Sequence, residues 1–150
     1  MRVLAATVVL AGCGYQSGSF DSPVRHFAGS LITVDCLDLA IDRRPDLPDG
    51  HAVVSYTFGN RCDHPVLVDL SQVEVLGRDA DGRSFELAAY DPRHEIEALR
   101  IDGRAVGGEA IAYESDESPQ QICVDAAAIS HVPTAAWLCI GSRPQLTEVP

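Results

Sequence analysis

Residues 52–59, AVVSYTFG, decide the fold class, because their side chains alternate with a period of two. Val54, Tyr56 and Phe58 fall on one face of an extended chain, and mostly smaller residues fall between them. β-Branched and aromatic residues favour a pleated strand over a helix. This stretch therefore predicts a β-strand whose Tyr56 and Phe58 anchor a core.

Runs of the same kind lie on both sides of this strand. Residues 31–41 alternate throughout and predict one long first strand, which is followed by a loop over residues 43–50 containing Pro45 and Pro48. Residues 79–82, DADG, predict a hairpin turn; the rival calcium loop would need a further acidic position and flanking helices. The other predicted strands cover residues 66–70, 72–76, 84–90, 109–114, 121–124 and 136–140, the last with Trp137 in the core.

Two segments are compatible with helical turns. Asp91 followed by Pro92 could cap one turn, although residues 95–101 alternate and could equally form a strand. Residues 125–130, DAAAIS, predict a single capped turn.

About eight short strands separated by Gly, Asp and Pro turns predict an all-β, antiparallel β-sandwich over residues 31–142. The order of these strands resembles that of immunoglobulin-like domains in bacterial envelope lipoproteins, over roughly residues 31–141. The antibody spacing, with a Trp between two bridged cysteines, is missing, because Trp137 comes two residues before the last Cys. The resemblance implies a fold and no particular activity.

The chain begins MRVLAATVVLAGC, with one basic residue and an apolar run too short to span a bilayer. Residues 10–13, LAGC, resemble a bacterial lipobox. The resemblance implies that residues 1–12 are a cleaved signal peptide and that Cys13 carries lipid such as palmitate. Residues 13–30 would then form a flexible tether. At the other end of the chain, residues 143–150 are expected to form a polar tail. Residue 14 is Gly, whereas an Asp at this position would have resembled a signal for retention in the inner membrane. We therefore expect the protein at the outer membrane.

Composition limits the partners of such a protein. The formal net charge of the chain is −11, and removal of Arg2 with the signal peptide makes it −12. Nucleic acid and anionic head groups would be repelled by this charge, so neither is an expected ligand. The membrane would be reached through the lipid on Cys13, and other partners would be an unidentified envelope protein or ligand.

Four cysteines remain besides Cys13, an even number that predicts disulfides in an oxidising compartment. Three pairings are open. We favour Cys36–Cys62 with Cys123–Cys139, because each pair flanks a predicted hairpin. Metal ligation is not expected, since no CxxC motif is present.

The most distinctive surface chemistry lies in two polar segments that mix Arg, His and acid with Pro. We treat them as one candidate binding patch, although local Arg–carboxylate contacts within two turns would explain the same residues. No motif for catalysis, metal or cofactor is present, so a non-catalytic binding or structural module is expected. The alternative is a periplasmic enzyme or metal carrier whose site is assembled from distant His and carboxylates. The patch residues are Arg61, His64, Asp91, Arg93, His94 and Glu95.

Overall fold

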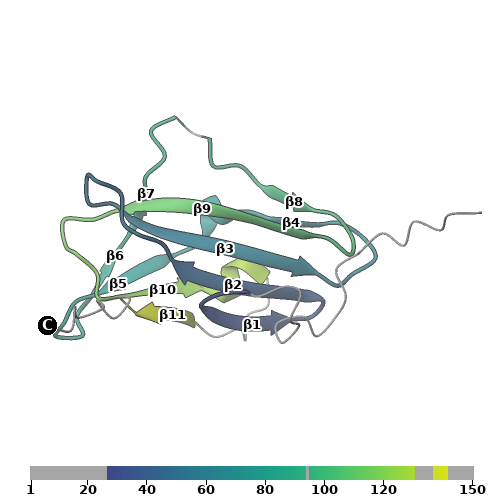
Figure 1. The fold of residues 1–150 in the computed structure, drawn as a ribbon, viewed down its shortest axis with the longest axis horizontal. Coiled ribbons are helices and arrows are strands. Elements are labelled where there is room, and N and C mark those ends of the chain that lie inside the picture. Colours follow the sequence, from purple (N-terminus) through teal and green to yellow (C-terminus); the bar gives the residue numbers. More distant parts are fainter. Residues whose placement is uncertain (1–26, 94, 131–136, 142–150) are drawn as a thin grey trace, which may run out of the picture.

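A computed structural model describes residues 27–93, 95–130 and 137–141, and these form an antiparallel β-sandwich (Figure 1). One sheet has the order β1-β2-β3-β9-β7 and the other the order β11-β10-β5-β6, while β4 and β8 form a separate two-stranded ribbon. The strands are β1 (Ser30–Val34), β2 (Leu37–Arg43), β3 (Ala52–Asn60), β4 (Val66–Val68), β5 (Val75–Arg78), β6 (Ser84–Glu86), β7 (Ala88–Ala89), β8 (Leu99–Ile101), β9 (Val106–Glu114), β10 (Gln121–Asp125) and β11 (Trp137–Gly141). The predicted class, an all-β sandwich, is confirmed.

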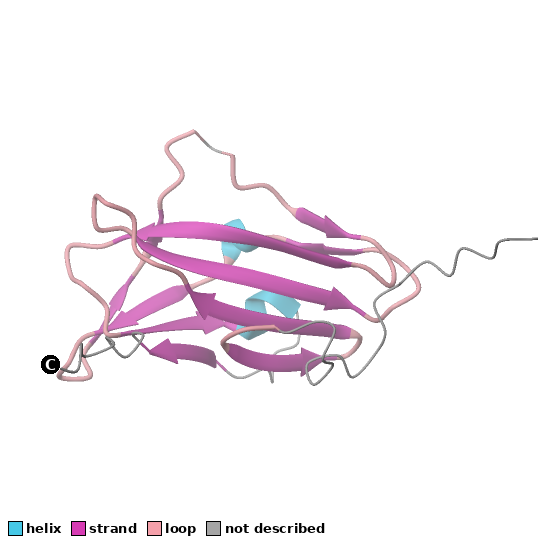
Figure 2. Cartoon of the chain, viewed as in Figure 1, coloured by secondary structure: helices cyan, strands magenta, loops and turns pink. Residues whose placement is uncertain are grey.

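The core lies between the two sheets, and Tyr56 and Phe58 of β3 are fully buried in it, as predicted. The opposite wall comes mainly from β10 and β11, together with Val75 of β5. A one-turn helix, α1 (Ala126–Ser130), follows β10, and a 3₁₀ turn covers Leu70–Gln72 (Figure 2). Asp125 caps α1 by accepting a hydrogen bond from the Ala127 N–H at 2.9 Å, as its sequence predicts.

The two sheets meet along both sides of the sandwich. On one side the Ser30 hydroxyl of β1 donates to the Cys139 carbonyl of β11 at 2.6 Å. On the other side the chain passes from β6 in one sheet to β7 in the other through Leu87, whose N–H donates to the Val75 carbonyl at 2.9 Å. The single strand predicted over residues 84–90 is therefore divided between the two sheets.

The long first strand predicted over residues 31–41 is wrong, because the chain reverses at Asp35 and Cys36. Asp35 has φ of 51°, in the left-handed region that Asp tolerates better than most residues with a side chain. The result is a two-residue hairpin in which Val34 pairs with Leu37.

The turn over residues 79–82 is confirmed: the Asp79 carboxylate accepts from the N–H groups of Asp81 and Arg83, each at 2.9 Å.

The last strand also differs from its prediction. Trp137 is not a core residue: it is 41% exposed, while the neighbouring Leu138 and Ile140 face inward.

The strand order differs from that of immunoglobulin constant domains, where the third strand belongs to the second sheet. Here β1, β2 and β3 are adjacent in one sheet. The described residues contain no helix that is long and apolar enough to cross a membrane.

Candidate functional site

The site begins where β7 stops pairing with β9. Ala88 pairs with Glu114 and Ala89 with Tyr113, and the Tyr90 N–H then donates to the Ala112 carbonyl at 2.8 Å. Continued in the same register, the chain would place Pro92 opposite Ala110. Proline has no N–H to donate, so the ladder cannot continue there.

From this point the chain leaves the edge of β9 and arches outward before it returns as β8, as seen above β9 in Figure 1. Asp91 holds the start of this arch: its carboxylate accepts from the N–H groups of Glu95 at 2.8 Å and Ile96 at 3.1 Å. The described residues after Asp91 form neither the helical turn nor the strand over 95–101 that the sequence left open, and only Leu99–Ile101 become β8. β8 pairs with β4 and not with β9.

The arch and β9 enclose a hollow of about 460 Å³, which we call the β9 hollow. One wall is the arch and the other is the stretch of β9 from residue 109 to 112. Its described lining combines apolar side chains with three carboxylates and one guanidinium: Tyr90, Asp91, Pro92, Arg93, Glu95, Ile96, Glu109, Ala110, Ile111 and Ala112.

Glu109 is the acidic residue of the β9 hollow that belongs to the sheet itself. Partial burial and the nearby Asp91 charge raise the pKa of Glu109 above its usual 4.5. The side chains of Tyr56 and Tyr113 lie in the adjoining core, with their hydroxyl oxygens 2.6 Å apart. Burial is the main cause that raises the pKa of Tyr113 to about 12, and the charge of Glu109 adds to it.

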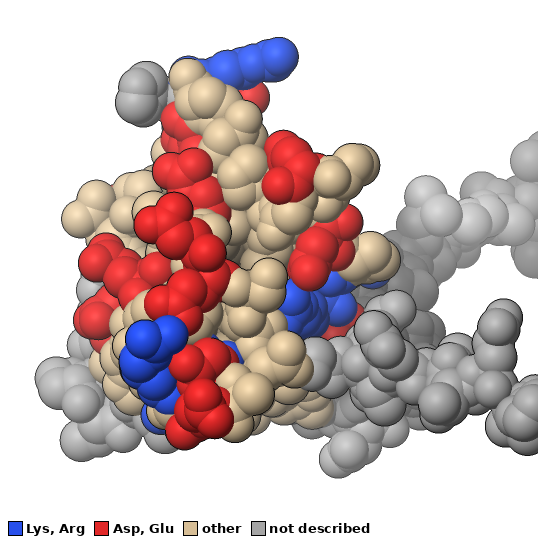
Figure 3. All heavy atoms as spheres, turned by 90° about the vertical axis from the view of Figure 1, so that its left-hand side faces the viewer, with Lys and Arg blue, Asp and Glu red and all other residues tan. Residues whose placement is uncertain are grey.

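A second hollow, of about 780 Å³, lies beside the ends of β6 and β9. Figure 3 shows this side of the molecule, where many acidic side chains gather. His51 lines it, and its ring stacks on Tyr90 with centroids 4.1 Å apart. A carboxylate oxygen of Asp49 lies 2.9 Å from Nδ1 of His51. Within the described ranges no three His, Cys, Asp or Glu side chains are arranged to hold a metal ion.

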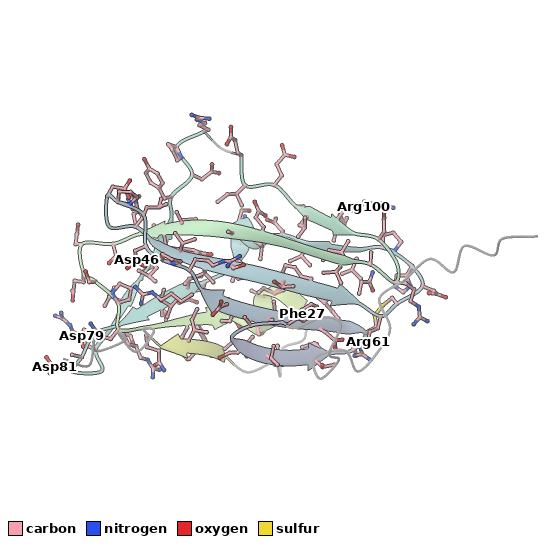
Figure 4. All side chains as sticks on the ribbon, in the orientation of Figure 1. Phe27, Asp46, Arg61, Asp79, Asp81 and Arg100 are labelled. Atoms are coloured by element: carbon pink, nitrogen blue, oxygen red, sulfur yellow. A yellow bond between two sulfur atoms is a disulfide. The ribbon has the colours of Figure 1, made fainter. Side chains whose placement is uncertain are left out.

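The structure does not bring the two halves of the predicted patch together. Arg61 and His64 follow β3, whose Gly59 pairs with Val106 at the start of β9. Asp91 lies near Ala112, six residues further along β9, and six residues of strand span about 20 Å. Figure 4 shows Arg61 at the end of the sandwich away from the arch.

Arg61 has a structural role. Its Nε donates to Asp38 at 3.1 Å, and its guanidinium also donates to the Asp35 carbonyl at 2.5 Å, so it ties β3 to the β1–β2 hairpin. Only 3% of the Asp38 side chain is exposed. His64 is largely exposed beside Asp63, and Arg93 lies 3.8 Å from Glu95 on the arch. His94 lies outside the described residues.

Asn60, which no sequence motif singled out, is fully buried at the end of β3. Its side-chain oxygen accepts from the Cys62 N–H at 2.9 Å, and its amide nitrogen donates to the carbonyls of His64, Ile101 and Asp102. These contacts fasten the segment after β3 to the one after β8. In the sequence, only the position of this Asn at the start of the polar run NRCDHP could have indicated a structural role. Its burial could not be read from the run, although a buried amide requires hydrogen-bond partners of this kind.

The cysteines lie as predicted. Cys36 is bonded to Cys62, with Cα atoms 5.4 Å apart, and Cys123 to Cys139, with Cα atoms 4.0 Å apart. Cys123 and Cys139 are directly opposite each other on β10 and β11, while the other pair joins the turn before β2 to the segment after β3. Cys13 lies outside the described residues.

No family model and no curated protein matches this chain. Among solved structures it is similar to the YjhA protein of Bacillus subtilis, with a TM-score of 0.42 and 7% sequence identity. The match covers 63% of this chain and 76% of that one.

Proposed function

We propose that this protein is a lipid-anchored module of the bacterial cell envelope that binds another envelope component without catalysing a reaction. The β9 hollow, set beside an interrupted sheet edge, is the observation that carries the binding role. Carboxylates and apolar groups around a concave surface suit recognition.

The anchoring part of the proposal rests on the sequence. Residues 10–13, LAGC, follow an apolar run, and a lipobox Cys would receive acyl chains that hold the protein on the membrane, with the outer membrane as the expected location. More than one acyl chain is needed for stable anchoring. The acidic formal charge offers no attraction to anionic lipids, so the lipid would provide the attachment.

Cell fractionation tests the anchor. The full chain and its Cys13→Ser variant are expressed in a bacterial host, and membranes are separated from the soluble periplasmic fraction. We expect the unchanged chain in the membrane fraction and the variant in the soluble fraction. An identical distribution of the two would contradict the proposal.

A photo-crosslinking amino acid tests the binding role in the same cells. It is placed at Glu95, in the lining of the β9 hollow, and in a matched control at Glu74, which is exposed before β5 in the other sheet. The proposal expects a discrete adduct at position 95 that is absent at position 74. Equal labelling at both positions, or none at 95, would remove the binding role from this hollow.

A further inference from the structure

We propose that the edge of β9 at Gly108 and Ala110 accepts an extended, basic peptide segment of a partner protein as an added β-strand. This inference rests on the proposed binding function and specifies its partner. The peptide would occupy the gap between β7 and β8, so that the β9 hollow contains its side chains. Recognition would combine backbone hydrogen bonds with the carboxylates around the gap.

The edge of β9 presents backbone N–H and C=O groups to which an added strand could bind. In an antiparallel strand, the N–H and C=O of one residue point to the same side, and those of the next residue point to the other. Ala112 directs its carbonyl to Tyr90 on the β7 side. The alternation places the backbone groups of Ala110 and Gly108 on that same edge. Among the described residues, no backbone hydrogen bond to these edge groups is formed.

No described strand of the chain pairs with β9 at this gap. Pro92 stands at the position that would pair with Ala110 and has no N–H. The next strand, β8, pairs with β4, where Ile101 is opposite Val66. The Asp91 carboxylate accepts hydrogen bonds from the N–H groups of Glu95 and Ile96, and these bonds stabilise the arch where it leaves β9.

The hollow gives an added strand room for its side chains. A volume of about 460 Å³ lies within the usual range for a binding pocket. Tyr90 and Ile96 offer apolar contacts along the same lining. An extended peptide with side chains alternating between its two faces could present apolar residues to these contacts.

The charges select a basic peptide. In the described lining, the carboxylates of Asp91, Glu95 and Glu109 stand against one guanidinium, that of Arg93, which lies 3.8 Å from Glu95. Lysine or arginine side chains of a partner would complement this excess of negative charge. A second copy of this acidic chain would bring like charges together at the same edge, so a different, basic protein is the expected partner.

The test uses the mature, lipidated chain in detergent and a capped hexapeptide of alternating lysine and valine. A glutamate–valine peptide of the same length is the charge control. A lysine–valine peptide methylated on alternate backbone nitrogens tests for strand pairing. We expect the lysine–valine peptide to bind at least about tenfold more tightly than either control, because both charge and ladder hydrogen bonds contribute.

Hydrogen exchange followed by NMR locates the contact. The amide protons of Gly108 and Ala110 should exchange more slowly when the lysine–valine peptide is bound. Binding without this protection would overturn strand addition, and so would equal binding of the methylated peptide. Protection that rises with protein concentration alone would identify a second copy as the occupant and would also overturn the proposal, as would failure of the lysine–valine peptide to bind.

Matched variants separate the site from general charge effects. The double variant Glu95→Gln/Glu109→Gln should weaken binding of the lysine–valine peptide by roughly tenfold, the loss expected from two charge pairs. Glu97→Gln removes a charge from the same arch outside the lining of the hollow and should bind as the unchanged chain does. Equal effects of the two changes would contradict the assignment. Fractionation of these variants should be unchanged, so failure here remains distinct from failure of the lipid anchor.

Discussion

The hydroxyl oxygens of Tyr56 and Tyr113 lie 2.6 Å apart inside the sandwich, one carried by β3 and the other by β9. Both side chains are almost fully buried, at 0% and 2% exposure. One hydroxyl donates this hydrogen bond and the other accepts it, and either tyrosine can be the donor. The pair therefore places a mutual polar contact in the core next to the β9 hollow.

A double-mutant cycle on this pair should give strongly non-additive results. Tyr56→Phe leaves the Tyr113 hydroxyl without this partner, and we expect a loss of about 1–3 kcal/mol in unfolding free energy. The double variant Tyr56→Phe/Tyr113→Phe removes both polar groups and should lose less than the sum of the single changes. Denaturant unfolding at neutral pH measures each value. Strict additivity would show that the hydroxyls do not depend on each other.

The two arginines of the predicted patch should respond differently to substitution. Arg61→Ala removes the cation from the nearly buried Asp38, and we expect a loss of about 3 kcal/mol. Arg93→Ala removes an exposed side chain and should change stability by less than about 0.5 kcal/mol. Urea unfolding of the two variants provides the comparison. A similar effect of both changes would contradict the structural role of Arg61.

Asn60 should be among the least tolerant polar positions of the chain. Asn60→Ala leaves the Cys62 N–H and the carbonyls of Ile101 and Asp102 without this partner, so we expect a loss of about 3 kcal/mol in unfolding free energy. Faster amide exchange should be concentrated in the segments after β3 and β8.

The matched control for this amide is Gln72, which is exposed at the end of the 3₁₀ turn. Gln72→Ala should leave stability nearly unchanged, because no buried group depends on an exposed side chain of this kind. Urea unfolding compares the two variants. A mild effect of Asn60→Ala, close to that of Gln72→Ala, would show that water replaces the lost contacts.

Glu109 should make stability depend on pH in a defined direction. Its pKa is raised in the folded protein, so the folded state keeps this proton to a higher pH than the unfolded chain. The stabilising contribution is complete below the usual pKa of 4.5 and is lost as the pH rises through the folded value. Glu109→Gln stays neutral. We therefore expect it to be more stable than the unchanged chain at about pH 7 but not at about pH 3.5.

Denaturant unfolding of both proteins at the two pH values measures this difference. Glu97→Gln, which removes an exposed carboxylate from the arch, controls for the loss of one negative charge. A Glu109→Gln variant that is less stable than the unchanged chain at about pH 7 would contradict the cause given for the raised pKa, because removal of the charge would then be unfavourable.

Local sequence patterns predicted the elements that depend on local chemistry. The alternation over residues 52–59 identified β3, the Asp79 turn followed from DADG, and Asp125 marked the start of α1. The pairing of the cysteines also followed, because each pair flanks a hairpin. Period-two alternation continues through Asp35, however, and so conceals the reversal there.

The site depended on relationships that no local pattern contains. Pro92 interrupts a ladder only because β7 is in register with β9, and that register is a tertiary feature. Trp137 is exposed because Leu138 and Ile140 take the inward positions of β11. Arg61 and Arg93 resemble each other in sequence context, yet one contacts Asp38 and the other lies on the arch. The two arginines therefore differ in their tertiary contacts, which their similar local sequences do not reveal.

The intact mass of protein extracted from bacterial membranes, before and after reduction and alkylation, tests the proposed lipid-anchored, disulfide-bonded module most directly. We predict a chain that begins at Cys13 and carries acyl mass, with four further thiols that react only after reduction. A mass without acyl groups would contradict the lipid anchor. Thiols that react without reduction would contradict the two disulfides of the sandwich.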